Sequence, residues 1–357
     1  MGNTLENIEV SVLMPAYNRG NYIESSIKSI LDQTFKRFEL LVLDDGSTDS
    51  TIEKVLSFND PRIRLIRNEK NKGIAFSRNR LFQEAKGSYY VLLDSDDIAM
   101  PNRIDLQLQY LKEKEDILLV GTPCIPIDQH GERIKSTWAF LQKRPTDPME
   151  IKATLLFRNC FYQSSIMINA KILKDAKYDL DFPPFEDFEF WARLAATHKL
   201  ANMNTPLIEY RFHSQNISHT TNEPFKFQLN NTIVSRGFIN SFNYQPTEQE
   251  LFVHGVWQFY SYKVGYEFLK ESSSWLKKLL KMNSTQLVFN DKIFATVLKK
   301  NWFDRCWHHL NKGNTFTAWY FLFYSPKFSF NDLGLFFYLA FKGIYIELTR
   351  KQKSEAT

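Results

Sequence analysis

The sequence predicts an α/β fold: a mostly parallel sheet with helices on both faces, followed by a mainly helical C-terminal extension. Strands alternate with helices at short loop spacing over about the first 120 residues, and several strands end in polar or acidic turns. Helical periodicity dominates after residue 225. The chain has 357 residues, which exceeds the usual size of one domain. We therefore expect one domain at 1–224, with halves at about 1–121 and 122–224, and a helical region at 225–357.

Apolar runs bounded by turn residues define the elements of the first half. The segment IEVSVLM at 8–14 is a buried-strand pattern ended by Pro15, and isoleucines at helical spacing predict a helix over 22–33. The segment DDGSTD at 44–49 supplies a tight turn and a helix cap. We expect strands at 8–14, 38–43, 63–66, from 88 onward and at 117–120, and helices at 22–33, 74–85 and 101–111.

The second half has a less regular pattern, because prolines and a glycine interrupt it between residues 123 and 148. A short apolar run predicts a strand at 164–168, and another predicts a last strand at 207–212. Between them, the periodicity predicts a helix at 185–198 whose first turn is acidic. Acidic residues in a first turn interact well with the helix dipole, which is their simplest structural explanation.

The segment SYYVLLDSDD at 88–97 runs from a buried strand straight into three carboxylates. Asp94 and Asp96 are two residues apart, so on an extended backbone they point the same way, while Asp97 points to the other side. Grouped carboxylates need a cation, and Mg²⁺ or Mn²⁺ would suit them. The alternative is an acidic loop that faces solvent. Ligands of parallel sheets bind at the carboxyl ends of strands, where Tyr17, Asn18, Asp44 and Asp45 also fall.

Several function classes fit poorly. The first strand is followed by PAYNRG instead of GxGxxG, and the chain has no GxxxxGK[ST] segment, so a bound nucleotide diphosphate would need a metal to meet its charge. Three cysteines without CxxC spacing argue against a disulfide framework and a structural zinc site, and favour a reducing compartment. No signal peptide is recognisable, so we expect a cytoplasmic location. Scattered basic residues without a recognisable module argue against nucleic-acid binding.

Five segments in register resemble the inverting family-2 nucleotide-sugar glycosyltransferases, which have the GT-A, Rossmann-like fold. They are VSVLMPAYNR, LLVLDDGSTD, NKGIAFSRNR, YYVLLDSDD and FEDFEFWARLA, and the similarity covers roughly residues 8–220. Each segment alone is weak, but five in this order form a strong signal. The resemblance implies a hexosyl- or N-acetylhexosaminyltransferase that uses Mn²⁺ or Mg²⁺ and acts in polysaccharide biosynthesis at the cell envelope.

The resemblance also implies roles for individual residues. Asp187, of the pair Glu186 and Asp187, would be the catalytic general base. Asp94 and Asp96 would form the metal motif, with Asp97 close by and His213 as a further ligand. The nucleotide would contact Pro15, Ala16, Tyr17, Asn18, Asp44 or Asp45, Lys72, Arg78, Asp94, Ser95 and Arg211.

The chemistry of inversion agrees with a single base. The acceptor hydroxyl must lose its proton on the face opposite the leaving nucleotide, so one carboxylate suffices and no second one is needed as a nucleophile. Simpler explanations exist for some residues: Lys72 and Arg78 as solvated helix charges, His213 as a surface or capping histidine, and Tyr17 as core filling.

The C-terminal region differs in charge from the rest of the chain. Residues 225–357 carry 17 Lys and Arg against 9 Asp and Glu, whereas the whole chain has a net charge of +5. Its most apolar run, at 333–348, is too short and too charged for a membrane span. We expect packed helices here. An additional peripheral contact with the membrane would use aromatic and lysine side chains.

The sequence therefore predicts sugar transfer from a nucleotide diphosphate, with UDP expected, to a hydroxyl of a glycan or lipid-linked glycan. One alternative is transfer to a polyprenyl phosphate, and another is a non-catalytic nucleotide-sugar-binding subunit of a polysaccharide assembly. A nucleotidyltransferase fits less well, because only Arg19 and Gly20 are available where it would need a Gly- and Lys/Arg-rich loop.

Overall fold

The structure is a computed structural model that describes residues 8–134, 144–216, 223–256, 265–311, 325, 334 and 337–343. The chain divides into two compact units. One comprises residues 1–155 and 159–221, and the other comprises residues 156–158 and 222–357. We call them the α/β unit and the helical unit and describe each by itself.

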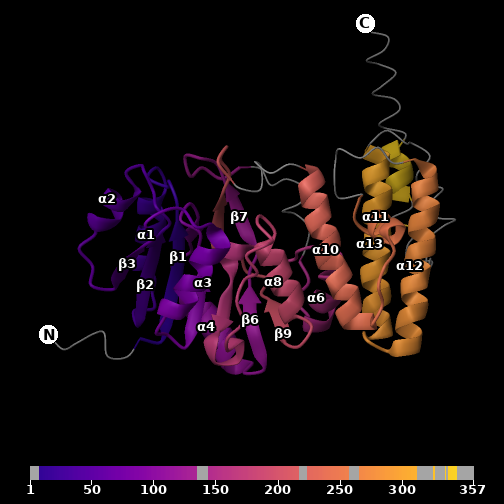
Figure 1. The fold of residues 1–357 in the computed structure, drawn as a ribbon, viewed down its shortest axis with the longest axis horizontal. Helices are drawn as coiled ribbons and strands as arrows, with labels where there is room; N and C mark the ends of the chain where they lie inside the picture. The colour runs from indigo at the N-terminus through magenta and orange to yellow at the C-terminus, as the bar shows by residue number, and fades with distance from the viewer. Residues whose placement is uncertain are drawn as a thin grey trace, which may run out of the picture. The chain divides into compact units, whose positions relative to one another are not determined.

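A seven-stranded sheet forms the centre of the α/β unit (Figure 1). Its strands are β1 (Val10–Ala16), β2 (Phe38–Asp44), β3 (Ile63–Arg67), β4 (Tyr89–Leu92), β6 (Ile117–Gly121), β8 (Met167–Asn169) and β9 (Lys199–Asn202). They lie in the order β3-β2-β1-β4-β8-β6-β9. All pairs are parallel except those of β8, which runs antiparallel to β4 and β6. The prediction of a mostly parallel sheet is confirmed.

Helices connect these strands and bury their apolar faces against the sheet. They are α1 (Ile23–Leu31), α2 (Thr51–Leu56), α3 (Ile74–Glu84), α4 (Arg103–Glu113), α6 (Pro148–Thr154), α7 (Ala170–Leu173) and α8 (Glu186–Leu194). Ile23, Ile27 and Ile30 of α1 have no exposed surface and join the core cluster formed by β1, β2 and β4. The isoleucine periodicity therefore identified the buried face of this helix.

A second, three-stranded sheet was not predicted. It contains β5 (Ile98–Ala99), β7 (Cys124–Ile127) and β10 (Ile208–Arg211), in the order β5-β10-β7. The strand expected at 207–212 is β10, and β5 follows Asp97 directly along the chain. This small sheet therefore brings the acidic segment that follows β4 next to the residues that follow β10.

The strand expected at 164–168 begins later than the apolar pattern suggests. Residues Gln163–Ser165 form the 3₁₀ turn η1, and β8 starts at Met167. The turn forms in place of a strand because Ser165 donates from its amide and from its hydroxyl to the carbonyl of Tyr162. This places Ser164 beside the carboxyl end of β4, where its hydroxyl accepts the amide N–H of Asp94 at 3.1 Å.

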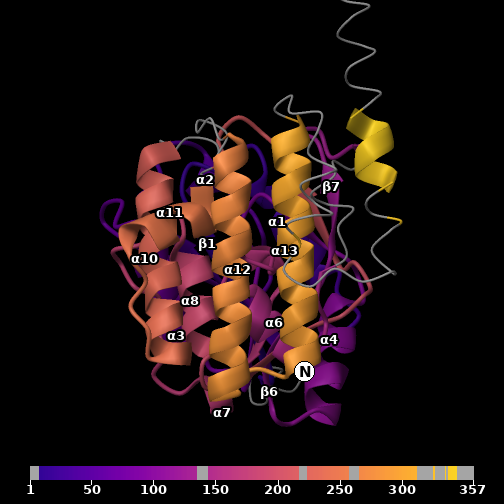
Figure 2. The same ribbon diagram turned by 90° about the vertical axis from the view of Figure 1, so that its right-hand side faces the viewer.

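The helical unit is built from α10 (Glu223–Phe242), α11 (Glu248–Gly255), α12 (Tyr266–Gln286) and α13 (Asp291–Asn311). Figure 2 shows α12 alongside α13, and these two helices pack against each other. Trp275, Phe294 and Trp302 are buried between helices, which confirms the expectation of a helical C-terminal part. Thr247 and Glu250 form a capping box at the start of α11.

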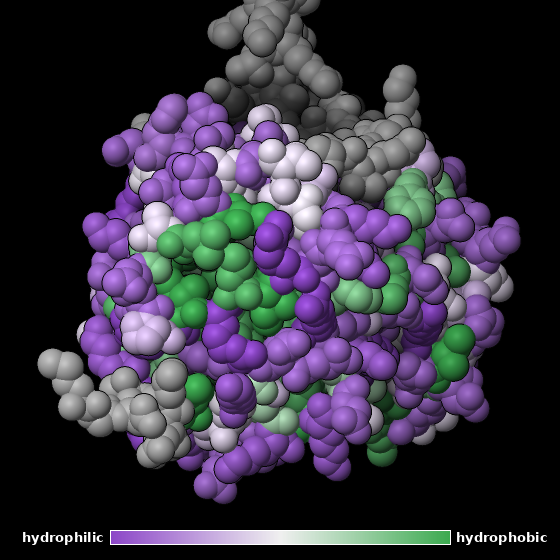
Figure 3. Space-filling view, turned by 60° about the vertical axis from the view of Figure 1, so that its left-hand side comes forward, coloured by the Kyte–Doolittle hydropathy of each residue, from purple (hydrophilic) through white to green (hydrophobic). Residues whose placement is uncertain are grey.

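Among the helices whose placement is described, none is long and apolar enough to cross a membrane. The face of the molecule drawn in Figure 3 is mostly hydrophilic, with one large apolar area near its centre and smaller ones towards its right side. A surface of this mixed kind is ordinary for folded proteins, because polar groups are too few to cover it.

Candidate active site

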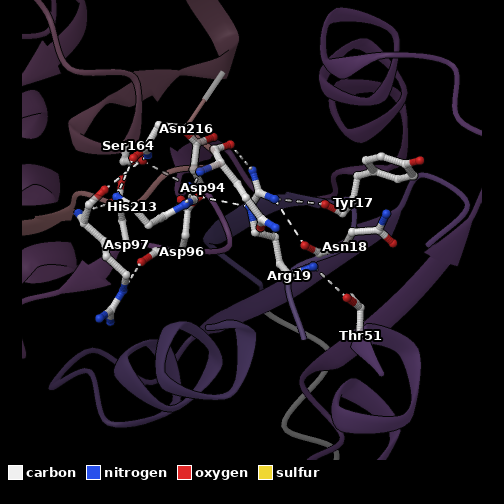
Figure 4. Close-up of polar contacts among 12 residues, drawn as sticks. Tyr17, Asn18, Arg19, Thr51, Asp94, Asp96, Asp97, Ser164, His213 and Asn216 are labelled. Carbon is white, nitrogen blue, oxygen red and sulfur yellow. Dashed lines mark hydrogen bonds and ion pairs between the residues drawn. The ribbon is translucent and has the colours of Figure 1, made fainter. Parts of the chain in front are cut away.

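Two loops at the carboxyl edge of the sheet are tied together. The amide of Asn18, after β1, donates to the hydroxyl of Ser47 at 2.9 Å, and the amide of Thr48 donates to Asn18 Oδ1 at 2.9 Å. Asn18 has a positive φ of 51°, which asparagine tolerates better than most residues. Tyr17 remains 41% exposed, and its ring points away from Asp96 (Figure 4). Core filling is therefore not the role of Tyr17.

Asp44 and Asp45 lie at the end of β2 and are buried. Asp45 accepts the amides of Lys72 and Gly73, each at 2.9 Å, and so holds the turn that precedes α3. Asp44 accepts the amide of Ser47 within its own turn. A nucleoside could use only the remaining lone pairs of these carboxylates.

Asp96 accepts two hydrogen bonds on one oxygen. Arg19 Nε donates to Asp96 Oδ2 at 3.1 Å, and His213 Nε2 lies 3.0 Å from the same atom (Figure 4). Burial raises the pKa of Asp96, but His213 and Arg19 outweigh it and hold this pKa below its ordinary value. Arg19 was not among the predicted site residues, although its place right after the first strand could have suggested it.

Two hydrogen bonds and a ring contact hold the imidazole of His213. Its Nδ1 accepts the amide of Gln215 at 3.2 Å, so the neutral ring carries its proton on Nε2 and donates to Asp96. The ring stacks on Tyr22 with centroids 4.7 Å apart. Its side chain is 1% exposed, so His213 is not a surface histidine, while its bond to the amide of Gln215 fits the alternative of a capping histidine.

Asp97 and Arg211 are buried and stabilise the loop that follows β4. Asp97 Oδ1 accepts the amide of Arg211 at 2.9 Å, and burial, together with Asp96 and Asp94, raises the pKa of Asp97 well above its ordinary value. Arg211 Nε donates to the carbonyl of Asp96 at 2.8 Å, and its other guanidinium nitrogens donate to Ser25 and to carbonyls of the loop after β7. The guanidinium of Arg211 thus stabilises this loop through hydrogen bonds. To reach a phosphate, it would have to leave these partners.

Arg78 joins two carboxylates from different elements. Its Nη1 donates to Glu186 Oε1 at 2.5 Å and its Nη2 donates to Asp94 Oδ1 at 3.0 Å. Burial would lower the pKa of Arg78, but Asp94 and Glu186 raise it above its ordinary value. Arg78 is therefore no solvated helix charge. Lys72, by contrast, has an exposed side chain that lies over the ring of Phe76 at 5.2 Å.

Asp187 stands at the start of α8 with both oxygens held. Oδ1 accepts the amide of Phe188 at 2.6 Å, and Oδ2 accepts Nδ2 of Asn159 at 2.9 Å. Burial and the neighbouring Glu186 raise the pKa of Asp187 to about 7, while Arg78 opposes the shift. A carboxylate with such a pKa is suited to general base catalysis near neutral pH. Asn159 is a second residue that the sequence did not single out.

The remaining predicted residues lie at the same edge. Pro15 and Ala16 are buried in β1, and Ser95 is buried between Asp94 and Asp96. Within the described ranges, no three His, Cys, Asp or Glu side chains converge as a ready-made metal cage. Asp96 and His213 could supply two ligands, because Asp96 Oδ2 and His213 Nε2 are 3.0 Å apart. Two neighbouring ligands of an octahedral Mg²⁺ ion, each about 2.1 Å away, have about this separation.

Comparisons with known proteins identify relatives of this chain. The family model described as glycosyl transferase family 2 matches residues 11–175. An uncharacterized glycosyltransferase of Haemophilus influenzae is 32% identical over 228 residues, which are 61% of this chain and 71% of that protein. The Escherichia coli enzyme WfgD, a UDP-Glc:alpha-D-GlcNAc-diphosphoundecaprenol beta-1,3-glucosyltransferase, is 30% identical over 226 residues, 63% of this chain and 85% of the enzyme.

Among solved structures, S. aureus TarS 1-349 in complex with UDP superposes with a TM-score of 0.53 at 17% identity, over 85% of this chain and 89% of that one. At this identity the likeness establishes the fold alone, which is of the GT-A type.

Proposed function

Because this chain belongs to glycosyltransferase family 2, we propose that it moves a sugar from a nucleotide diphosphate, with UDP as the nucleotide, to a hydroxyl of a glycan or lipid-linked glycan. The observation that carries the proposal is Asp187, a half-buried carboxylate with a pKa of about 7 at the carboxyl edge of the sheet. UDP in the TarS complex and the lipid-linked acceptor in the name of WfgD support the choice of substrates.

Asp187 would take the proton of the acceptor hydroxyl as the oxygen attacks the anomeric carbon. The bond from that carbon to the diphosphate breaks on the opposite face, which inverts the configuration. A single base is enough for this displacement. Within the pair, Arg78 neutralises Glu186 through an ion pair, which leaves Asp187 as the candidate base. The negative charge of Glu186 still raises the pKa of Asp187, because the two carboxylates repel each other.

Asp96 and His213 are the residues that would hold Mn²⁺ or Mg²⁺. One carboxylate and one imidazole suit an ion that also takes oxygens from the substrate phosphates and water. When bound, the ion would stabilise the negative charge of the departing diphosphate. Coordination through Nε2 of His213 needs the proton on Nδ1, so the bond from the amide of Gln215 must break when the ion binds.

We further propose that residues 337–343 touch an anionic membrane surface. Phe337, Tyr338 and Phe341 are 52%, 44% and 68% exposed, and Lys342 lies 5.8 Å from the ring of Trp307. Exposed aromatics beside lysine suit the headgroup region. In sedimentation with phosphatidylglycerol vesicles, the chain should pellet, and Phe337→Ser with Phe341→Ser should stay in the supernatant. Equal pelleting of both forms would overturn this proposal.

Calorimetric titration with UDP, GDP and CMP, each with and without Mn²⁺, tests the nucleotide site. UDP should bind only with Mn²⁺ and lose this binding in Asp96→Ala. Asp116→Ala is the matched control, because Asp116 is an exposed carboxylate paired with Lys199 at the opposite end of the sheet. If no nucleotide binds under any condition, a non-catalytic role takes the place of this proposal.

Transfer itself is tested with Asp187→Asn, which should lose turnover by a factor of about 10² to 10⁴ and keep UDP binding. The phosphate of a polyprenyl phosphate is already anionic and needs no base. Full turnover by Asp187→Asn would therefore redirect the proposal to that acceptor class.

A further inference from the structure

Asn159 is the one side chain from outside α8 whose hydrogen bond to Asp187 is resolved in the described part of the chain. Its Nδ2 donates to Asp187 Oδ2 at 2.9 Å. Its Oδ1 accepts the amide of Phe161 at 3.0 Å, which fixes the orientation of the carboxamide and leaves the NH₂ group facing the carboxylate. The other oxygen of Asp187 is held by the amide of Phe188. Asn159 therefore limits the orientation in which Asp187 Oδ2 can face an acceptor hydroxyl.

The three residues before Asn159 belong to the helical unit, although the chain on either side of residues 156–158 belongs to the α/β unit. The carbonyl of Leu156 accepts Nε2 of His254 at 2.8 Å. The ring of Phe157 stacks on the imidazole of His254 with centroids 4.5 Å apart. Arg158 forms an ion pair with Asp304 at 3.2 Å. Each of the three residues is thus attached in a different way.

His254, which provides two of these attachments, is itself fixed. Trp275 Nε1 donates to its Nδ1 at 3.0 Å, so the proton sits on Nε2 and points at the carbonyl of Leu156. The neighbouring backbone is held too, because Arg305 donates to the carbonyl of His254 at 2.7 Å. His254 has no exposed surface. The three-residue segment is therefore bound to a rigid, buried group.

We propose that Asn159 is a positioning residue for Asp187, and that the attachments of the three preceding residues, 156–158, limit the conformations open to Asn159. This inference rests on the role of Asp187 as base in the proposed function. A hydrogen bond to a carboxylate favours its charged form, and so opposes the burial and the charge of Glu186 that raise the pKa of Asp187. A segment held at three successive residues leaves Asn159 few alternative positions.

The direct test is a titration of Asp187 by ¹³C NMR of aspartate carboxyl carbons, with Asp187→Asn to assign the signal. Asn159→Leu removes the donor at similar size and should raise the pKa of Asp187 by about one unit. Asn159→Asp is nearly isosteric, so it protects the test if the leucine variant fails to fold, and it should raise this pKa further. A wild-type pKa in both variants would overturn the role of Asn159.

The attachment of residues 156–158 is tested by charge reversal at the ion pair between Arg158 and Asp304. Arg158→Asp and Asp304→Arg should each raise the pKa of Asp187 and lower kcat for UDP release from UDP-glucose or UDP-GlcNAc more than they change KM. The double reversal should restore both values. Lys278→Glu is the control, because it breaks an ion pair with Glu250 in the same unit away from this segment. If the single reversals lower only the melting temperature, the attachment of residues 156–158 has no positioning role.

The failure of this inference can be told apart from failure of the proposed function. Full transfer by Asp187→Asn would refute the base itself. Loss of transfer in Asp187→Asn together with an unchanged pKa in the Asn159 variants would refute only the positioning.

Discussion

Replacing Asp187 by asparagine should make the protein more stable at alkaline pH while it destroys turnover. The pKa of Asp187 is raised from 3.8 to about 7, mainly by burial and next by Glu186. A group whose pKa is raised on folding stabilises the folded state when it is protonated, below pH 3.8. This contribution is lost as the pH rises through the folded pKa, near 7. Asparagine is neutral and avoids that loss, but its NH₂ group replaces one of the two oxygens that accept hydrogen bonds from Phe188 and Asn159.

The magnitude follows from the size of the shift. About three pKa units at 1.36 kcal/mol each would correspond to about 4 kcal/mol above pH 7. Asp187 is only half-buried, so solvent screening reduces this bound, and the loss of one hydrogen bond reduces it by about 1 kcal/mol more. We therefore expect a gain of about 1–2 kcal/mol for Asp187→Asn at pH 8. The gain should shrink as the pH falls and vanish near pH 4, where the carboxyl is protonated in both states.

Urea unfolding of wild type and Asp187→Asn at pH 4.5, 6 and 8 measures the difference in their free energies of unfolding. In parallel, kcat/KM of the wild type should rise about tenfold per pH unit up to about pH 7 and then level off, because only the ionised carboxylate accepts the proton. A variant less stable than wild type at pH 8, or a kcat/KM that does not change between pH 5 and 8, would refute the environment assigned to Asp187.

Three further predictions concern groups around the site and in the helical unit. Arg78→Met leaves Asp94 and the buried Glu186 without their cation and should lower the free energy of unfolding in urea by about 3–5 kcal/mol. A loss below about 1 kcal/mol would contradict the stabilising role of these two ion pairs. Gly46→Ala should cost at least about 2 kcal/mol in the same assay, because φ is +77° and a Cβ would lie 2.8 Å from a backbone carbonyl carbon. Gly73→Ala is its control and should cost only about 1 kcal/mol, since φ is +90° but no atom lies within 4 Å, and equal costs would exclude the clash. Burial lowers the pKa of His254 from 6.5 to about 3, so its contribution to stability, full above pH 6.5, is lost as the pH falls towards 3. The melting temperature of His254→Gln should therefore fall less between pH 7 and 4.5 than that of the wild type, and parallel curves would argue against a neutral, buried imidazole.

Local patterns in the sequence predicted the elements better than their pairing. Isoleucines at helical spacing located the buried face of α1, and the DDGSTD segment located the turn after β2. Neither pattern could show that β8 runs antiparallel or that β10 leaves the main sheet for a small second one. Strand pairing joins segments that are far apart in the chain, so no local pattern records it.

The acidic segment after β4 shows the same limit at the level of side chains. Spacing along the strand suggested that Asp94 and Asp96 act together, yet Asp94 pairs with Arg78 and Asp96 with Arg19 and His213. Arg211 was expected at the phosphates, and in this structure its guanidinium is bound to the loop that follows β4, a contact that the sequence did not reveal. Arg19 and Asn159 were missed because their partners lie 77 and 28 residues away.

By itself, the sequence determined the α/β class, the family and the residue types gathered at the carboxyl edge of the sheet, because apolar periodicity and turn residues act over a few neighbouring positions. Only the tertiary structure decided which carboxylate meets which cation. Those pairings set the charge and pKa of each group, which is why Asp187, beside Glu186 and Asn159, differs from Asp96, whose pKa lies below its ordinary value between Arg19 and His213.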